Sequence, residues 1–313
     1  MGNRSEQGGA RPDPSLDVIM SERRHLINLA YRLLGSLTEA EDAVQETYTR
    51  WYAMPRQQQA AIQTPAAWLT TVASRICLDQ LGSARVRRER YVGEWIPEPL
   101  PDPAEWASGA PGGIAADPAD RVTLDESVSM AFLVVLESMT PAERVAFVLH
   151  DIFRYSFAEV AEITGRSPAA CRQLASSARR RIDAAQPPAT VAAPQQAGII
   201  REFKRAWEAG DIDALVGLLD PAVTVVADGG GQVSAALHPI TGREHLVRYA
   251  LQIASLAPDL AMLERTVNGQ PGLVAQVDGV IVTVFSFEFE GDRITRIWAV
   301  RNPDKLRPWT QAD

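Results

Sequence analysis

The residues best suited to chemistry lie between positions 166 and 184, where five arginines stand against one acidic residue. Arginine and glutamine donate paired hydrogen bonds to base edges, and arginine also binds phosphate. An apolar stripe at helical spacing predicts a helix with one buried side: Cys171, Leu174, Ala178 and Ile182. We predict that its opposite side contacts DNA through Ser167, Arg172, Gln173, Ser176, Arg179 and Arg180. A helical hairpin with a solvated basic face is the alternative.

The elements around this segment are typical of a helix-turn-helix. Capping boxes at Thr140 and Ser156 predict the starts of two short helices. Gly165 ends the second of them and a longer helix begins after Ser167, which is the order that places a second helix in the DNA major groove. We therefore predict an all-α domain over residues 124–184.

A second basic segment, residues 74–91, has five arginines against two acids. Opening a DNA duplex requires cations for the backbone and aromatic surfaces for extruded bases. A helix predicted from Pro65 supplies both, and its candidate DNA-binding residues are Trp68, Arg75, Arg85, Arg87 and Arg88. A place in the core is the alternative for Trp68. With a further helix start predicted at a Thr38 capping box, these segments form an all-α domain over residues 18–91.

Charge and composition separate the domains from linkers. The chain carries a net charge of −8, but residues 93–126 alone contain eight acids and one arginine. Proline and glycine content predicts an acidic linker over residues 92–123, a second linker over 185–196 and a disordered N-terminal segment over 1–17. Two cysteines in separate segments, and no apolar run of about 20 residues, favour a cytoplasmic protein without a membrane span.

Within residues 197–313 the pattern of apolar residues changes from helical spacing to the alternation typical of strands. Helical patterns are followed by segments with strand-like alternation at residues 261–267, 273–277, 280–290 and 294–300. Helices followed by an antiparallel sheet predict an α+β domain. This domain is acidic, with 15 acids and 11 basic residues.

The ordered combination of these segments resembles the sigma-70 family in its small, extracytoplasmic-function (ECF) form. Residues 38–52 (TEAEDAVQETYTRWY) resemble the helix that binds the clamp of core RNA polymerase. Residues 64–81 (TPAAWLTTVASRICLDQL) resemble the helix that melts the promoter and reads its minus-ten element. Residues 136–181 resemble the domain that reads the minus-thirty-five element beside the polymerase flap. Arg75 and Ser177 depart from the family pattern, so no promoter preference is implied.

This resemblance implies core RNA polymerase and promoter DNA as partners, and a function in directing transcription initiation, typically in a stress response. It also implies that the polymerase-binding residues are Asp42, Gln45, Glu46 and Thr49.

Three further motifs resemble an ECF subgroup with a fused SnoaL-like domain, which has a cone-shaped NTF2-like fold. They are YVGEWIPEP (91–99), DGGG (228–231) and NPDKL (302–306). The resemblance implies that this domain modulates the sigma factor in cis, through contacts with the first domain or the linker. The candidate pocket or regulatory residues are Trp95, Asp228, Gly229, Gly230, Gly231, His238, Trp298, Asn302, Asp304 and Lys305.

Two other functions fit parts of the sequence. A ligand-sensing helix-turn-helix regulator would need residues 140–182 to bind DNA and residues 197–313 to bind the ligand. This alternative assigns no function to residues 18–91. A SnoaL-like enzyme would use Asp228, His238 and His245 as acid and base, with Trp207, Phe285 and Trp298 lining its pocket. Because each of these residues also has a purely structural interpretation, we expect no catalytic residue, although the pocket could hold a small-molecule ligand. The sequence lacks a phosphate-binding glycine loop and zinc-ligand spacing, so no cofactor or metal is expected.

Overall fold

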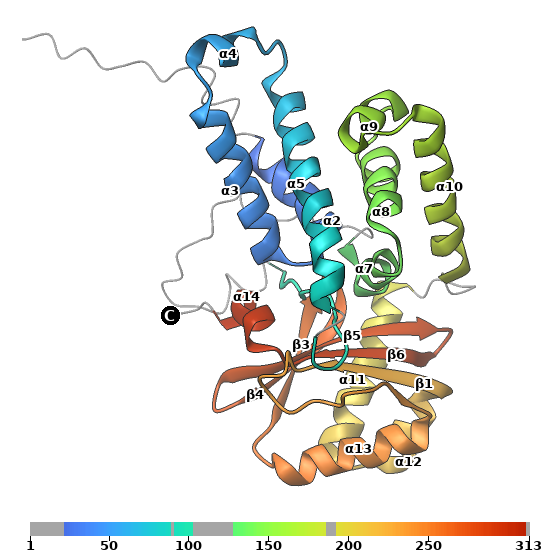
Figure 1. Cartoon of the computed structure of the whole chain (residues 1–313). Coiled ribbons are helices and arrows are strands. Elements are labelled where there is room, and N and C mark those ends of the chain that lie inside the picture. The colour runs from blue at the N-terminus through green and yellow to red at the C-terminus, as the bar shows by residue number, and fades with distance from the viewer. Residues whose placement is uncertain (1–21, 89–90, 103–127, 186–191, 311–313) are drawn as a thin grey trace, which may run out of the picture.

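The computed structural model describes residues 22–88, 91–102, 128–185 and 192–310, without the side chains of 84–88. The first domain is helical, and Figure 1 shows its elements α2 (Arg23–Leu34), α3 (Leu37–Ala53), α4 (Arg56–Ala61) and α5 (Pro65–Arg88). The predicted helix start at Pro65 is confirmed. The start predicted at Thr38 is wrong, because Ser36 is the N-cap of α3 and its Oγ accepts from the Glu39 backbone N–H.

The second domain contains the predicted helix-turn-helix. Its elements are α7 (Met130–Glu137), α8 (Pro141–Phe147), the π-helical turn η3 (Val148–Ile152), α9 (Phe157–Thr164) and α10 (Pro168–Ala185). Both predicted capping boxes are present, with Thr140 capping α8 and Ser156 capping α9. Gly165 ends α9 at a φ of 65°, a left-handed conformation that glycine adopts without the steric penalty of a Cβ.

The third domain is α+β, as predicted. Its helices are α11 (Ala193–Ala209), α12 (Ile212–Leu218), α13 (Arg243–Leu256), η4 (Pro303–Leu306) and α14 (Arg307–Thr310). Its strands are β1 (Leu219–Asp228), β2 (Ile240–Thr241), β3 (Ala261–Val267), β4 (Gln270–Val277), β5 (Val280–Glu290) and β6 (Arg293–Val300). The sheet order is β2-β1-β6-β5-β4-β3, and β1 runs parallel to β6 while the other neighbours are antiparallel.

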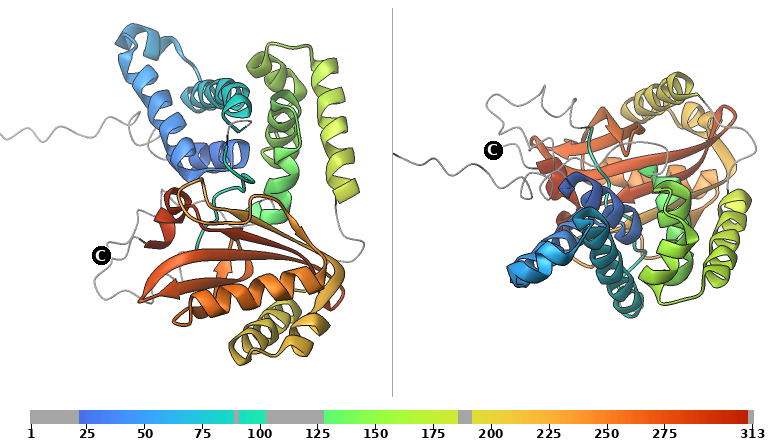
Figure 2. Two further views of the ribbon diagram at one scale, coloured as in Figure 1. Left: turned by 60° about the horizontal axis from the view of Figure 1, so that its bottom comes forward. Right: turned by 90° about the horizontal axis from the view of Figure 1, so that it is seen from above.

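The sheet lies between helices of its own domain and the two helical domains. Figure 2 shows α11, α12 and α13 on one side of the sheet and both helical domains on the other. The helix side is packed around apolar residues such as Phe203, Val225 and Ile297. On the other side Trp298 and Val300 of β6 pack with α7, α14 and the segment that follows α5. One face of the sheet therefore forms the core of the third domain, and the other face forms its contact with the rest of the chain.

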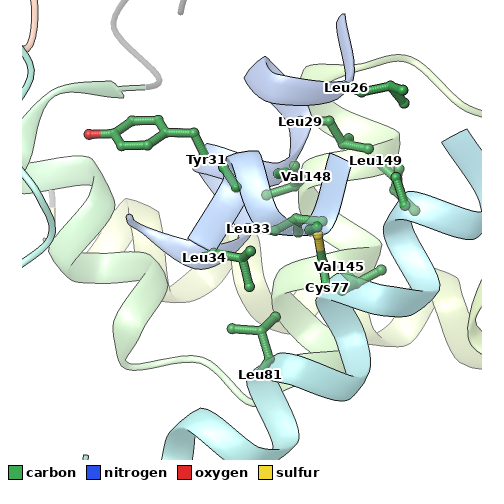
Figure 3. Close-up of a cluster of buried hydrophobic side chains, with 14 of the residues drawn as sticks. Leu26, Leu29, Tyr31, Leu33, Leu34, Cys77, Leu81, Val145, Val148 and Leu149 are labelled. Atoms are coloured by element: carbon green, nitrogen blue, oxygen red, sulfur yellow. The ribbon is translucent and has the colours of Figure 1, made fainter. Parts of the chain in front are cut away.

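The two helical domains share one apolar core. Figure 3 shows Leu26, Leu29 and Leu33 of α2 in one cluster with Cys77 of α5 and Val148 of η3. Every residue from Leu26 to Leu34 is buried, because α2 is covered from both domains. The first and second domains are thus packed directly against each other.

The segment after α5 differs from the predicted linker. Residues 91–102 are extended, and Ile96 to Leu100 are buried between the first and third domains. Pro101 forms an isolated bridge with Val267 at the end of β3. Prolines suit this position because an extended chain between two packed surfaces donates few ladder hydrogen bonds. The rest of the predicted linker, from residue 103 to 123, lies outside the described residues.

Candidate nucleic-acid interface and its intramolecular contacts

The polar side of α10 faces solvent, as the sequence predicts. Arg172, Gln173 and Arg180 are exposed, and Ser167 is exposed just before the helix. The helix is held in this orientation by a buried stripe of Cys171, Ala175, Ala178 and Ile182. The Arg172 guanidinium carbon lies 5.5 Å from the centre of the Phe157 ring at the start of α9. This face combines a basic charge with hydrogen-bond donors suited to base edges and phosphates.

Two of the predicted DNA-binding arginines already have partners within the domain. Arg179 forms a two-bond ion pair with Asp151, in which Nε lies 2.6 Å from Oδ1 and Nη2 lies 3.2 Å from Oδ2. Arg180 donates from Nη1 to the Ser176 hydroxyl at 3.2 Å. Because Asp151 neutralises Arg179, the charge available to a phosphate is smaller at Arg179 than at Arg172.

The predicted polymerase-binding residues of α3 are gathered on one exposed ridge. Asp42, Gln45, Glu46 and Thr49 are all exposed, and their spacing places them on one side of the helix. The opposite side is buried through Ala40, Ala43, Val44, Thr47 and Trp51. The ridge is therefore accessible to a partner while the chain is folded as described.

The minus-ten candidates of α5 have different environments. Trp68 is only partly exposed, and its ring lies against that of Trp51 with centres 5.2 Å apart and planes at 62°. Arg75 donates from Nη2 to the Glu162 carbonyl at 2.7 Å and from Nε to the Ile163 carbonyl at 3.4 Å. These carbonyls lie in the last turn of α9, where helix carbonyls lack partners within the helix. The side chains of Arg85, Arg87 and Arg88 lie outside the described residues.

Other polar contacts also join the first and second domains. His25 of α2 lies 3.1 Å from the Tyr155 hydroxyl, which donates to Thr70 Oγ1 at 3.2 Å. Arg144 of α8 donates to the Leu33 carbonyl at 3.0 Å. Burial lowers the pKa of Arg144 to about 9. The two domains that carry the DNA-binding candidates are thus held together by hydrogen bonds as well as by a shared core.

Asp228 lies where the three motifs of the resemblance meet. Its fully buried carboxylate accepts from the Tyr91 hydroxyl at 2.6 Å, the Ile96 N–H at 3.0 Å and the Gly230 N–H at 3.0 Å. It also accepts from Lys305 Nζ at 2.6 Å, and Lys305 donates further to the Ile96 carbonyl at 2.5 Å. A buried carboxylate with four donors, one of which is its counterion Lys305, is well satisfied. These bonds to Tyr91 and Ile96 hold the segment after α5 against the third domain.

The remaining motif residues surround this ion pair. Lys305 Nζ lies 4.1 Å from the centre of the Trp95 ring, a cation–π distance. Asn302 donates from Nδ2 to the Tyr91 hydroxyl at 2.8 Å. Asp304 is exposed and accepts from Gln232 at 2.7 Å. Asn302 and Lys305 therefore bind the segment after α5, whereas Asp304 binds Gln232 and Arg307 at the surface.

The glycines of the 228–231 motif are required by close packing. A Cβ on Gly230 would lie 2.4 Å from Asn302 Nδ2, and one on Gly229 would lie 2.4 Å from the Val233 carbonyl oxygen. Gly231 has a φ of 70° and would approach Val92 to 3.1 Å. A side chain at Gly230 would therefore push away the residue that holds Tyr91.

Glu98 connects the same segment to the polymerase-binding helix. Its Oε2 accepts from the Ser36 hydroxyl and from the Leu37 N–H, both at 2.9 Å, at the start of α3. Its carbonyl accepts from the Tyr31 hydroxyl at 2.7 Å. Burial raises the pKa of Glu98 to about 7, and the hydrogen bonds from Ser36 and Leu37 oppose that rise.

We predict that Glu98 makes the stability of the chain depend on pH. Because the pKa is raised on folding, the folded state binds the proton more tightly, so this stabilisation is complete below about pH 4.5 and is lost as pH rises through about 7. The loss should be on the order of 3 kcal/mol. In urea denaturation at a series of pH values, the free energy of unfolding should fall less steeply with rising pH for Glu98→Gln than for the wild type. Glu94→Gln is the matched control, and equal pH profiles for wild type and Glu98→Gln would contradict this role.

Asn268 is a junction residue that the sequence pattern did not indicate. It lies in the β3–β4 turn with a φ of 52°, and its side chain is fully buried. Its Nδ2 donates to the Tyr31 hydroxyl at 2.9 Å and to the Val128 carbonyl at 2.8 Å, and its Oδ1 accepts from the Leu100 N–H at 3.0 Å. Only its Asn-Gly turn was predictable. The side chain joins all three domains.

The residues of the enzymatic interpretation do not come together. Asp228 lies at the junction, while His238 and His245 are exposed. Trp207 and Phe285 line a cavity between the sheet and its helices, as expected. Trp298 does not, because it lies on the opposite face of the sheet and packs toward the helical domains.

Neither a metal site nor a membrane-spanning helix lies among the described residues. No group of three or more His, Cys, Asp or Glu side chains among them could hold a metal ion. No helix in the described ranges has both the length and the apolarity to cross a bilayer. Cys77 and Cys171 are buried free thiols.

Comparison with known proteins identifies the family. Residues 18–87 match Sigma-70 region 2, and residues 129–182 match Sigma-70, region 4. The ECF RNA polymerase sigma factor SigJ of Mycobacterium tuberculosis is 38% identical over 296 residues, covering 91% of this chain and 90% of SigJ. The crystal structure of that SigJ matches with a TM-score of 0.72 at 34% identity, covering 95% of this chain and 100% of that one.

A SnoaL-like protein of unknown function from Burkholderia thailandensis matches with a TM-score of 0.30 at 20% identity, covering 35% of this chain and 97% of that one. The similarity to SigJ, in contrast, extends over nearly the whole chain and includes both regions that sigma factors share. The chain belongs to the ECF RNA polymerase sigma factors.

Proposed function

We propose that this sigma factor alternates between the closed arrangement described above and an open arrangement on core RNA polymerase. In the open arrangement the α3 ridge docks on the polymerase clamp, α5 opens the minus-ten element, and α10 binds the minus-thirty-five element beside the flap. The third domain modulates activity in cis by stabilising the closed arrangement. Such coupling requires that the domain contact the two arrangements unequally.

The contact between Arg75 and α9 is the observation that carries this proposal. The two promoter elements are named for positions about 25 base pairs apart, which corresponds to roughly 85 Å along B-DNA at 3.4 Å per base pair. In the closed arrangement Arg75 of α5 lies 2.7 Å from a carbonyl of α9, within the helix-turn-helix. Elements in direct contact cannot reach both promoter sites, so promoter binding requires that the two domains separate.

The position of the third domain supports its regulatory role. It binds the segment after α5 through Asp228 and Lys305, and that segment in turn caps α3 through Glu98. Asn268 additionally contacts α2 through Tyr31 and the start of the second domain through Val128. When the helical domains separate, these contacts cannot all be kept. The third domain therefore favours the closed arrangement.

Run-off transcription with purified core polymerase tests the proposed function. A promoter template should give a transcript only when this chain is added, and the free chain should bind the same DNA weakly. A ligand-sensing regulator would instead bind an operator tightly without polymerase. Failure to associate with core polymerase would overturn the assignment of the α3 ridge. Asp42→Ala combined with Glu46→Ala should weaken that association, whereas Asp213→Ala, on α12 of the third domain, is the control.

We predict that Arg172→Ala weakens the promoter complex more than Arg179→Ala. Arg172 is exposed without an acidic partner among the described residues, whereas Arg179 is neutralised by Asp151. If Arg172 reads a base, its loss should cost about 1–3 kcal/mol of discrimination at one position of the minus-thirty-five element. Fluorescence anisotropy with the polymerase holoenzyme and single-base promoter variants measures this. Arg205→Ala on α11 is the matched control, and equal effects of Arg172→Ala and Arg179→Ala would contradict the prediction.

A further inference from the structure

A partly enclosed cavity lies between the sheet and helices α11 and α13. Its volume is about 180 Å³. Most of its wall is apolar, formed by residues such as Phe203, Trp207, Val225, Met262, Phe285 and Ile297. The junction contacts described above lie on the other face of the same sheet, so those contacts do not involve this cavity.

Two polar side chains that line the cavity are those of Thr283 and Arg301. Thr283 is 5% exposed and lines the wall, and its hydroxyl makes no hydrogen bond within the described ranges, although this oxygen is not one of their fully buried atoms. Arg301 also lines the wall, and its guanidinium donates only to the Ser234 carbonyl, with no carboxylate beside it in the part of the chain described. Both groups can therefore donate hydrogen bonds to a molecule that enters the cavity.

Strand register places these two polar groups together. Val284 of β5 pairs with Val300 of β6, so Thr283 and Arg301 occupy the next position along the two antiparallel strands. A β-bulge also occurs here, because Ala275 pairs with Thr283 but the next residue of β4 pairs with Ile281. The bulge turns Val282 as well as Thr283 into the cavity, although neighbours in a regular strand face opposite sides. The cavity therefore has one polar end and one apolar end.

We propose that this cavity is a binding site for a single-ring aromatic carboxylate. A cavity of ~150 Å³ with apolar walls accepts benzene, so the measured volume suits one ring and a small substituent. A carboxylate matches the polar end, because its two oxygens accept simultaneously from the Arg301 guanidinium and the Thr283 hydroxyl. The ring then lies against Phe285 and Ile297.

Occupancy of this site would act on strands that also form the regulatory junction. Along β6, Ile297 and Ala299 face the cavity, whereas Trp298 and Val300 face the helical domains. Arg301 immediately precedes Asn302, which holds Tyr91. This consequence rests on the proposed closed arrangement, but the binding site does not. Binding can be measured on the full chain without polymerase, so failure of one proposal is distinguishable from failure of the other.

Titration of the full chain with benzoate and with toluene tests the site. Isothermal titration calorimetry should show saturable one-to-one binding of both probes, with a tighter benzoate complex. Arg301→Gln should weaken benzoate about tenfold or more and change toluene by less than about twofold, because only the carboxylate loses a charged donor. Arg205→Gln makes the same charge change on the outer surface of α11 and should alter neither.

Two further variants test the location of the site. Ala299→Leu fills the apolar part and should abolish binding of both probes, provided that circular dichroism shows a folded chain. Thr283→Val keeps the side-chain shape and should weaken the binding of benzoate several-fold. This variant tests the location of the site if Ala299→Leu does not fold. Absence of saturable benzoate binding by the wild-type chain overturns the proposal. Equal benzoate affinity in wild type and Arg301→Gln overturns the assignment of the carboxylate.

Discussion

Replacing Lys305 by methionine is expected to lower the free energy of unfolding of the full chain by about 3 kcal/mol. The change leaves the Asp228 carboxylate, which is 0% exposed, without its counterion. Removing one partner of a buried ion pair typically costs on the order of 3–5 kcal/mol. Because the Tyr91 hydroxyl and the Ile96 and Gly230 N–H groups still donate to Asp228, we expect the lower end of that range. Urea denaturation combined with amide hydrogen exchange over residues 91–102 measures the loss.

Two controls distinguish the buried pair from an ordinary surface pair. Lys204→Met removes the exposed pair between Lys204 and Glu208 on α11 and should cost less than about 1 kcal/mol. The double variant Asp228→Asn with Lys305→Met removes both charges and should recover part of the loss. A loss no larger for Lys305→Met than for Lys204→Met would show that the ion pair does not hold the junction.

Local signals predicted the helical domains well. The caps at Thr140 and Ser156 and the left-handed Gly165 are decided by residues within one helical turn, so the sequence alone contains the necessary information. The cap at Ser36 also has a local pattern, because Ser36 and Glu39 have the spacing of a capping box. Thr38 and Glu41, two residues further on, have the same spacing, so the pattern alone did not decide which of the two residues begins the helix.

The third domain shows a second limit of local patterns. β1 was not predicted, although Val223, Val225 and Ala227 alternate in it, because Pro221 lies in the same strand and prolines are depleted in strands. Similarly, α11 begins at Ala193, inside the linker predicted over residues 185–196. Its first turns are rich in alanine and glutamine and show no apolar stripe.

Residue spacing also failed to decide which face of an element meets which neighbour. The alternation of β6 showed that Trp298 and Val300 share a face, but both faces of this sheet are apolar. Trp298 was therefore assigned to the pocket when it packs toward the helical domains. Likewise the proline-rich composition of residues 91–102 predicted a linker, whereas burial of Ile96 and Leu100 depends on surfaces from two other domains.

Replacing Asn268 by glycine is expected to raise polymerase-dependent transcription at limiting polymerase by about tenfold or more. Glycine adopts the φ of 52° without strain, so the change deletes the side chain and preserves the turn. It leaves the buried Leu100 N–H and Val128 carbonyl without their partner, at a cost of about 1–3 kcal/mol each. The substitution therefore destabilises the closed arrangement, because the three domains meet at Asn268 in that arrangement and not in the open one. A difference of 1.4 kcal/mol changes the ratio of closed to open chains about tenfold.

Asp278→Gly separates this effect from a general loosening of the sheet. Asp278 has nearly the same φ, 51°, in the neighbouring β4–β5 turn, but it is exposed and lies away from the junction. It should leave transcription unchanged. Amide hydrogen exchange supplies an independent measure, because opening of the junction should increase exchange of residues 96–101 in Asn268→Gly alone. If exchange rises there while transcription stays at the wild-type level, separation of the domains does not limit activity, and the third domain does not regulate initiation through this junction.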